Sequence, residues 1–259
     1  MPVALTDVIG REHRFDRPPG RVVSLVPSLT ETLFDLGAGG SVAAVTDFCL
    51  FPKAELRALT RIGGTKTPRI DEIARLAPDL IYVNLEENLR RHAEALGKSA
   101  AVFATGPKSV GEVESLLAVL GRIHGVEPAA GEWIARLRRE REAAAGRRFT
   151  FACPIWKDPW MWCGGDTYVS DLVSAAGGVN VLAGESRYPR RPLVEVLALA
   201  PEVIFLPDEP YAFTAGDARP IAGAARVVGP FPGHLFTWHG TRTVAGLRFL
   251  RESLAAELS

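Results

Sequence analysis

The chain has 259 residues, 47% apolar and 23% charged, a composition typical of a globular protein long enough for one large domain or two lobes. Its 30 lysine and arginine residues balance 30 aspartate and glutamate residues, so no long-range positive field exists to hold a phosphate backbone. Disordered and fibrous classes are excluded, and nucleic acid is not expected as a partner.

The N-terminus contains no apolar run of the length that a signal peptide or a membrane anchor needs. We therefore expect either an exported protein whose leader has been removed or a cytoplasmic protein, and in neither case a membrane-embedded one. The first residues predict a short hairpin that closes at residues 18–20, where two prolines and a glycine stand together.

The first lobe is predicted from a strand, a tight turn and a capped helix. Residues 22–26 form an apolar run of buried-strand length, Ser28 and Glu31 have the spacing of a capping box, and Gly37 ends the helix. The alternation of strands and helices that follows predicts an α/β lobe with a mostly parallel sheet. Further strands are expected at residues 42–46, 80–84 and 101–104, and helices at residues 70–76 and 89–96.

Two consecutive helices come next in the chain. A second capping box, Ser109 with Glu112, opens a helix to about His124, and residues 127–148 predict one long helix with i,i+4 charge pairs. The apolar side of the long helix is only a short stripe around Leu137, which favours a bridge between two bodies. We accordingly expect an N-terminal lobe at residues 1–108, connecting helices at residues 109–148 and a C-terminal lobe at residues 149–259.

The second lobe repeats the pattern of the first. Residues 70–81 align without gaps on residues 193–204, and both segments contain a helix, an Ala-Pro break, an acidic residue and an apolar strand. The sequence therefore predicts two similar Rossmann-like α/β lobes joined by a single long helix. In the second lobe, strands are expected at residues 149–155 and 203–206, weaker strands at residues 227–228 and at Phe236, and helices at residues 169–176, 193–199 and 241–258.

Motifs for catalysis or metal binding are sparse. No nucleophile elbow, P-loop or dinucleotide fingerprint follows a strand, so no catalytic residue is assigned and no enzyme is expected. His234 and His239 are the one close histidine pair, and either a metal site or a plain loop would explain them. Cys49, Cys153 and Cys163 are interpreted as buried thiols, with contact between Cys153 and Cys163 across neighbouring strands as the alternative.

Tryptophans of the second lobe lie in or beside loops that contain proline and glycine. Either they close the ends of the core, or they form an aromatic wall for a bulky, planar ligand. Loops at residues 84–88, 156–160 and 208–213 each follow a strand, and ligands of open α/β sheets bind outside the carboxyl ends of the strands. The tryptophans in question are Trp156, Trp160, Trp162 and Trp238.

Polar groups are expected at the same crevice. Glu86, Glu87 and Glu209 would place carboxylates there, and the helix starts at Ser28 and Asp166 would place backbone N–H groups there. Loop acids of this kind are either simply solvated or suited to a ligand with hydroxyls, amides or a chelated metal.

An ordered set of motifs resembles the substrate-binding proteins of ABC importers in the helical-backbone group (class III), which captures cobalamin, haem and iron-siderophore chelates. Within that group the chain is most similar to the cobalamin-binding-like branch. The general motifs are at residues 21–33, 63–66, 76–80 and 164–167, and those of the branch are at residues 84–88, 156–160, 209–211 and 238–240.

The resemblance implies a two-lobed, non-enzymatic receptor that holds a metal chelate in a cleft between the lobes. Cobalamin is the first candidate, with haem and ferric siderophores next, and the chelate is a ligand rather than a resident cofactor. The resemblance also implies a monomer that docks on an ABC permease outside the cytoplasm. The expected ligand-binding residues are Ser28, Phe48, Glu86, Glu87, Trp156, Trp160, Asp166, Glu209, Tyr211, Trp238 and His239.

Permease docking in this group uses one exposed carboxylate per lobe. The resemblance places these on Asp71 or Glu72 in the first lobe and, by the repeat, on Glu195 in the second, although Val194 occupies the neighbouring position where the acid is expected. Two alternatives stay open. One is a metal-cofactor enzyme or metallochaperone that uses His239 and the loop glutamates, and the other is a cytoplasmic relative for ligand binding or storage.

Overall fold

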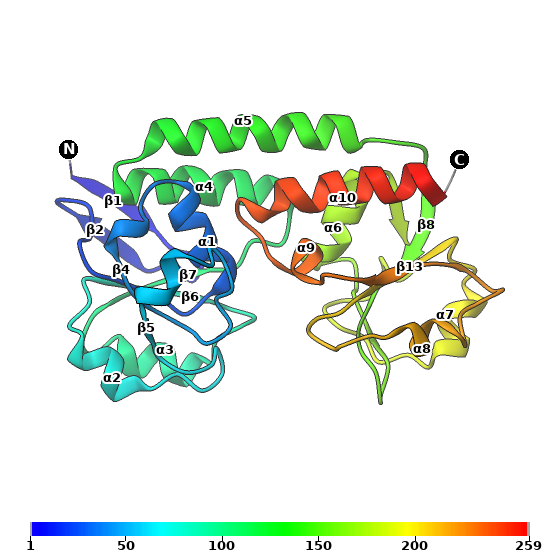
Figure 1. Ribbon diagram of the computed structural model, residues 1–259, viewed down its shortest axis with the longest axis horizontal. Coiled ribbons are helices and arrows are strands. Elements are labelled where there is room, and N and C mark those ends of the chain that lie inside the picture. Colours follow the sequence, from blue (N-terminus) through cyan, green and yellow to red (C-terminus); the bar gives the residue numbers. More distant parts are fainter. Residues whose placement is uncertain (1, 258–259) are drawn as a thin grey trace. The chain divides into compact units, whose positions relative to one another are not determined.

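The computed structural model describes residues 2–257 and divides the chain into two compact units (Figure 1). The N-terminal unit extends to Pro107 and includes Glu114–Ala135, and the C-terminal unit contains Lys108–Val113 and the chain from Arg136 onward. The chain passes between the units at three places: one lies just before α4 (Val110–His124), one lies inside α4, and one lies inside α5 (Glu127–Ala144). The expected lobe boundaries at residues 108 and 148 stay a prediction.

The N-terminal unit contains a five-stranded parallel sheet in the order β5-β4-β3-β6-β7. One face of the sheet packs on α1 and α4 through Leu29, Leu33 and Leu120, and the other packs on α2 and α3 through Ile73 and Leu96. The strands are β3 (Val22–Ser24), β4 (Val42–Val45), β5 (Thr60–Arg61), β6 (Leu80–Asn84) and β7 (Ala101–Thr105). The helices are α1 (Pro27–Asp35), α2 (Ile70–Arg75) and α3 (Arg90–Leu96), with short 3-10 turns at Gly39–Ser41 and Glu55–Ala58.

The N-terminal hairpin consists of β1 (Val3–Thr6) and β2 (Glu12–Phe15), and its turn differs from the expected one. Asp7 holds the turn, because its carboxylate accepts hydrogen bonds from the backbone N–H of Ile9 (3.1 Å) and of Arg11 (2.9 Å). The same carboxylate accepts from the N–H of Ala104 in β7 at 3.2 Å. The turn therefore lies at residues 7–11, and the prediction that it closes at residues 18–20 is wrong.

The two predicted capping boxes have different outcomes. Helix α1 begins at Pro27, one residue before the expected cap, so Ser28 lies inside the helix and is buried. Proline favours the first position of a helix, because its φ is fixed near the helical value and it has no backbone N–H to satisfy. Pro27 therefore starts the helix, and Ser28 does not act as its cap. In the second box, Ser109 Oγ accepts from the N–H of Glu112 at 3.0 Å as predicted, whereas the Glu112 carboxylate accepts from the N–H of Lys108.

The C-terminal unit contains a four-stranded parallel sheet in the order β11-β8-β12-β13. The expected strand at residues 149–155 is divided in two, and Phe236 lies in a helix rather than in the expected strand. The strands of the sheet are β8 (Phe149–Ala152), β11 (Gly178–Asn180), β12 (Val203–Pro207) and β13 (Arg226–Phe231), and a separate hairpin consists of β9 (Pro154–Trp156) and β10 (Met161–Trp162). The helices are α6 (Tyr168–Ala175), α7 (Leu193–Ala198), α8 (Ala215–Ala218), α9 (His234–Thr237) and α10 (Arg242–Glu257).

The internal repeat has the same structure in both units. Strands β4-β3-β6-β7 and β11-β8-β12-β13 follow one topological order, and the alanine before each junction proline has a positive φ, 44° at Ala77 and 51° at Ala200. The acidic residue of each junction binds the start of the neighbouring strand. The Asp79 carboxylate accepts from the N–H of Arg21 at 2.8 Å, and the Glu202 carboxylate accepts from the N–H of Thr150 at 2.7 Å. The prediction of two similar α/β lobes is confirmed.

Candidate functional site

The strand order reverses once in each sheet, and this position defines where loops with binding residues gather. In the N-terminal unit the reversal lies between β3 and β6, and in the C-terminal unit it lies between β8 and β12. Connections from such neighbouring parallel strands leave in opposite directions, so a crevice opens outside their carboxyl ends. The predicted loops at residues 84–88 and 208–213 follow β6 and β12, whereas the loop at residues 156–160 joins β9 to β10 in the separate hairpin that comes after β8.

In the N-terminal unit, one buried side chain connects the loops that follow β3, β5 and β6. The Asn88 amide nitrogen donates to the carbonyls of Leu25 (3.1 Å) and Thr65 (3.0 Å), and its oxygen accepts from the N–H of Asn84 at 2.7 Å. Asn84 in turn accepts from the N–H of Glu86 at 2.8 Å. The loop that carries the expected glutamates is therefore held rigidly at its base.

The outer surface of these loops is both charged and apolar. Glu86 is exposed and Glu87 is half-buried, while Phe48 is 59% exposed and its ring covers Gly64, where an added Cβ would lie 3.2 Å from the ring. Leu50 and Leu85 are also exposed on loops that follow β4 and β6. Sequence reasoning missed both leucines, because a single apolar residue gives no local signal of whether it faces the core or the solvent.

In the C-terminal unit, an aromatic ladder supports the expected tryptophans. Trp156 is 43% exposed and meets Tyr211 edge-on at 5.4 Å between ring centroids, and Tyr211 packs on Phe213 at 4.7 Å. Phe213 stacks on Trp160 at 5.8 Å, and Trp160 stacks on the fully buried Trp162 at 5.4 Å. Trp156 is thus the exposed end of a ladder whose inner end belongs to the core.

An ion pair that sequence reasoning missed fastens the loop between Trp156 and Trp160. Lys157 Nζ lies 2.6 Å from the Asp217 carboxylate, which also accepts from the N–H and the hydroxyl of Thr214 at the start of α8. The Lys157 hydrogen bond, followed by those of Thr214, lowers the pKa of Asp217 to about 2. The two charged residues are 60 positions apart, so no local pattern could have paired them.

Glu209 lies half-buried against the segment that contains α9. Its carboxylate accepts a hydrogen bond from the Thr237 hydroxyl at 2.9 Å, and burial raises its pKa. The neighbouring Asp208 carboxylate accepts from the N–H of Gly233 at 2.7 Å. The start of the β12 loop is therefore fixed at Asp208 and Glu209, before the cis Glu209-Pro210 bond.

Other expected binding residues are placed inside the C-terminal unit. His239 is 4% exposed and meets the Tyr168 ring edge-on at 6.3 Å, and burial lowers its pKa to about 4, so the imidazole is neutral at pH 7. Trp238 is buried beside His234. The Asp166 carboxylate accepts from the N–H of Arg187. The binding roles of these residues and of Ser28 stay predictions.

No cluster of side chains among the described residues supports the hypothesis of a metal site. Within residues 2–257, no three histidine, cysteine, aspartate or glutamate side chains gather closely enough to hold a metal ion. In the same range, no helix combines the length and the apolar character that a membrane crossing requires.

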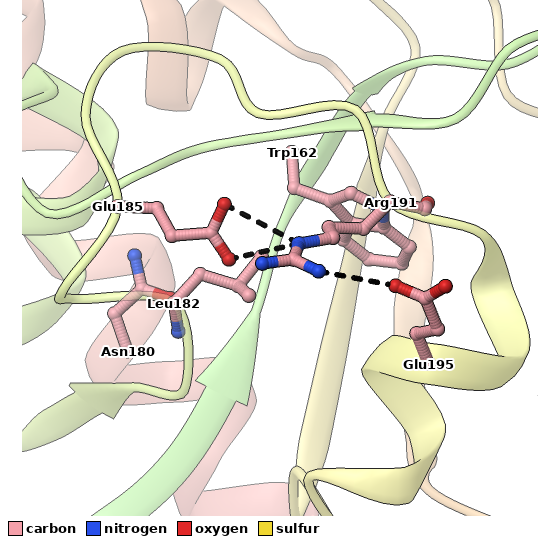
Figure 2. A network of polar contacts seen from close by, with 6 residues as sticks. All are labelled: Trp162, Asn180, Leu182, Glu185, Arg191 and Glu195. Carbon is pink, nitrogen blue, oxygen red and sulfur yellow. Dashed lines mark hydrogen bonds and ion pairs between the residues drawn. The ribbon is translucent and has the colours of Figure 1, made fainter.

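The expected docking acids occupy equivalent positions on α2 and α7. Arg69 pairs with Glu72 at 2.6 Å, and Arg191 pairs with Glu195 at 3.3 Å, as Figure 2 shows for the second pair. Asp71 is exposed in the first turn of α2, and its counterpart Val194 on α7 is 72% exposed. Arg191 also contacts Glu185 at 3.0 Å, and its backbone carbonyl accepts from Trp162 Nε1 at 2.9 Å.

Comparisons with known proteins agree on one family. The vitamin B12-binding protein of Vibrio cholerae serotype O1 is 26% identical over 196 residues, which are 73% of this chain and 70% of that protein. The crystal structure of the periplasmic vitamin B12 binding protein BtuF of Vibrio cholerae matches with a TM-score of 0.78 at 22% identity, over 93% of this chain and 99% of that one. The structure of the periplasmic haem-binding protein RhuT from Roseiflexus sp. RS-1 matches with a TM-score of 0.75 at 19% identity, over 92% of this chain and 99% of that one.

The two structural matches confirm the predicted two-lobed α/β fold. Residues 22–218, about three quarters of the chain, match the family described as periplasmic binding protein. The chain belongs to the periplasmic binding protein family.

Proposed function

We propose that this protein is the substrate-binding protein of an ABC-type importer, that it binds a metal chelate, with cobalamin as the first candidate, and that it is not an enzyme. The observation that carries the proposal is the outward end of the aromatic ladder. Trp156 presents a large exposed ring, which Tyr211 and the rings behind it hold in place. A rigid aromatic face suits a bulky and partly planar ligand, because little side-chain entropy is lost on binding.

The N-terminal unit offers a complementary surface for the same class of ligand. Phe48, Leu50 and Leu85 provide exposed apolar area on the strand-end loops, and Glu86 and Glu87 lie beside them in the sequence of the β6 loop. A corrinoid or porphyrin chelate has an apolar ring system with polar substituents, which matches apolar rings and leucines bordered by carboxylates. The expected cleft between the two lobes stays a prediction.

Family membership supports the remaining parts of the proposal. Relatives include proteins named for binding vitamin B12 and haem in the periplasm. We infer that this protein acts outside the cytoplasm as a monomer, that its chelate is cargo rather than a cofactor, and that Asp71 or Glu72 together with Glu195 contacts a permease. The exposed position of Asp71 and Glu195 supports this docking role.

Titration of the intrinsic tryptophan fluorescence with cyanocobalamin, haemin and a ferric siderophore tests the proposed function. We expect one of them to quench the fluorescence at micromolar concentration, with calorimetry as a second readout that is free of inner-filter effects. The substitution Trp156→Ala should weaken that binding about five- to tenfold, because stacking on one aromatic ring contributes about 1–1.5 kcal/mol.

The matched control is Trp133→Phe, which changes a tryptophan on α5 whose Nε1 donates to the carbonyl of Asp35. It should leave the affinity within about twofold. If none of the three chelates binds at micromolar concentration by either method, the proposed function is wrong.

A further inference from the structure

Two cysteines lie side by side at the base of the hairpin that carries the aromatic ladder. Cys153 immediately precedes β9 and Cys163 immediately follows β10. The N–H of Cys163 donates to the carbonyl of Cys153 at 2.8 Å, one position beyond the register pair Trp162 and Pro154. The two residues are therefore direct cross-strand neighbours in an antiparallel pair.

Their thiols are buried and interact with each other. Both residues are at most 1% exposed, and both are free thiols in this structure. A hydrogen bond between the two side chains, together with burial, raises the pKa of Cys153. The hydrogen bond from Cys153 Sγ to the Pro154 carbonyl is long, at 3.8 Å.

The third cysteine provides an internal comparison. Cys49 is also buried, but its Sγ lies 3.1 Å from Thr30 Oγ1 and 3.3 Å from Thr46 Oγ1, so hydroxyl groups rather than a second thiol surround it. Burial raises the pKa of Cys49, which disfavours its reactive thiolate form. Contact between thiols is thus the feature that distinguishes Cys153 and Cys163.

The backbone geometry is compatible with a covalent bond between the two sulfurs. Directly opposed residues in antiparallel strands have Cα atoms roughly 4.5 to 5.5 Å apart, whereas a disulfide spans about 4.4 to 6.8 Å. Rotation of the two side chains would bring the sulfurs of these neighbouring residues together. We propose that Cys153 and Cys163 form a reversible disulfide that closes the base of the β9–β10 hairpin.

The oxidant in this reaction is a low-molecular-weight disulfide. One cysteine thiolate attacks the oxidant, forms a mixed disulfide and releases one thiolate. The second cysteine thiolate then attacks the protein sulfur of the mixed disulfide, which forms the Cys153–Cys163 bond and releases the second thiolate. The two protons lost by the protein go to the released thiolates, so two cysteines are oxidised and one oxidant molecule is reduced to two thiols.

Burial predicts how this reaction depends on folding. A reagent reaches the two sulfurs only when the hairpin opens locally, so the reaction should be slow in the folded protein and fast during refolding. Once formed, the bond links the two ends of the segment that contains Trp156, Lys157 and Trp160. The disulfide would therefore restrict opening of the hairpin that supports the ladder.

The test compares reduced protein refolded in a mixture of reduced and oxidised glutathione with folded protein incubated in the same mixture. Remaining thiols are alkylated in denaturant, and intact and peptide masses are measured. We expect one alkylated cysteine, Cys49, in the refolded sample, together with a linked peptide that contains Cys153 and Cys163. Treatment with dithiothreitol should restore three alkylated cysteines.

Single serine variants distinguish a bond between Cys153 and Cys163 from a bond that involves Cys49. Cys49→Ser should retain the linked peptide and show no alkylated cysteine. Cys153→Ser and Cys163→Ser should each show two alkylated cysteines and no linked peptide. Three alkylated thiols in the wild type after both treatments would overturn the proposal, and so would a glutathione adduct without a linked peptide or a bond that involves Cys49. The masses measured for the wild type test the Cys153–Cys163 bond even if a serine variant fails to fold.

Discussion

At the scale of single residues, Tyr82 and His124 form a polar pair inside the N-terminal unit. The Tyr82 hydroxyl lies 2.9 Å from His124 Nε2, and both residues are buried. Burial lowers the pKa of His124 to about 4, whereas an exposed histidine titrates near 6.5. The imidazole is therefore neutral in the folded protein at a pH where the unfolded chain would already bind a proton.

This shift predicts a pH-dependent stability. Well above pH 6.5 neither state binds the proton at His124, so the contribution of His124 to the free energy of unfolding is constant there. This contribution falls as the pH drops through 6.5 towards 4, because only the unfolded chain takes up the proton. The loss from His124 amounts to at most about 3 kcal/mol.

Urea unfolding of the wild type and of His124→Gln between pH 7 and pH 4.5 measures this contribution. Glutamine retains a hydrogen-bonding group for Tyr82 but does not titrate, so the curve of the variant should be flatter. Burial also lowers the pKa of His239, so the contribution of His124 is the difference in the free energy of unfolding between the wild type and the variant. Parallel curves would contradict the assignment to His124.

At the scale of elements, α5 and α10 are connected in the C-terminal unit by charges that face each other across the helices. Glu140 on α5 contacts Arg248 at 2.7 Å and Arg251 at 3.3 Å on α10, and its side chain is only 16% exposed. Ion pairs with one largely buried partner contribute more than exposed pairs, because solvent screens them less. This cluster should hold the second half of the long helix in place.

The substitution Glu140→Gln is expected to lower the free energy of unfolding by about 1–2 kcal/mol, because two arginines lose their common partner. Glu142→Gln, an exposed change on the same helix, is the matched control and should have an effect below about 0.5 kcal/mol. Chemical unfolding at low and at high salt measures both. Equal effects of the two substitutions would mean that the cluster does not stabilise the unit.

At the scale of the whole molecule, α5 belongs to both units. The division between the units falls between Ala135 and Arg136, so one uninterrupted helix contributes to two cores. In the N-terminal unit Ala130 packs closely on Gly121 of α4, where an added Cβ would lie 2.7 Å away, and Leu137 is fully buried just beyond the division. A break in this helix should therefore disturb more than local packing.

Leu137→Pro is expected to destabilise the protein by about 3 kcal/mol or more and also to weaken chelate binding, because proline removes a hydrogen bond and bends the helix. Leu137→Met, which keeps the helix and most of the volume, is the control and should retain binding. Calorimetric titration of each folded variant with the chelate measures its affinity and checks this expectation. Unchanged affinity in a folded Leu137→Pro protein would show that continuity of α5 is not needed for binding.

Some residues of the candidate site follow from local pattern and others do not. The loops at residues 84–88, 156–160 and 208–213 are predictable, because each follows an apolar run that ends in polar residues, and the second and third also contain a proline. Burial of Trp162, Trp238 and His239, by contrast, depends on which side of a loop packs inward. The Lys157–Asp217 pair and the contact between Cys153 and Cys163 depend on pairings between segments, which a single sequence does not specify.

The sequence by itself determined most of the helices and strands of the two sheets, their order and the repeat, because periodicity, proline breaks and glycine stops act within a few residues of the chain. The family resemblance rested on its ordered set of motifs. The junctions at Ala77-Pro78 and Ala200-Pro201 are the clearest case, since both adopt the same backbone conformation and place an acid on the neighbouring strand. Tertiary structure alone decided that Pro27 and not Ser28 starts α1, that Asp7 turns the first hairpin, and that Trp156 rather than Trp162 is exposed. These outcomes depend on competition for burial and hydrogen bonds between segments that are distant in the chain, and local propensity does not record that competition.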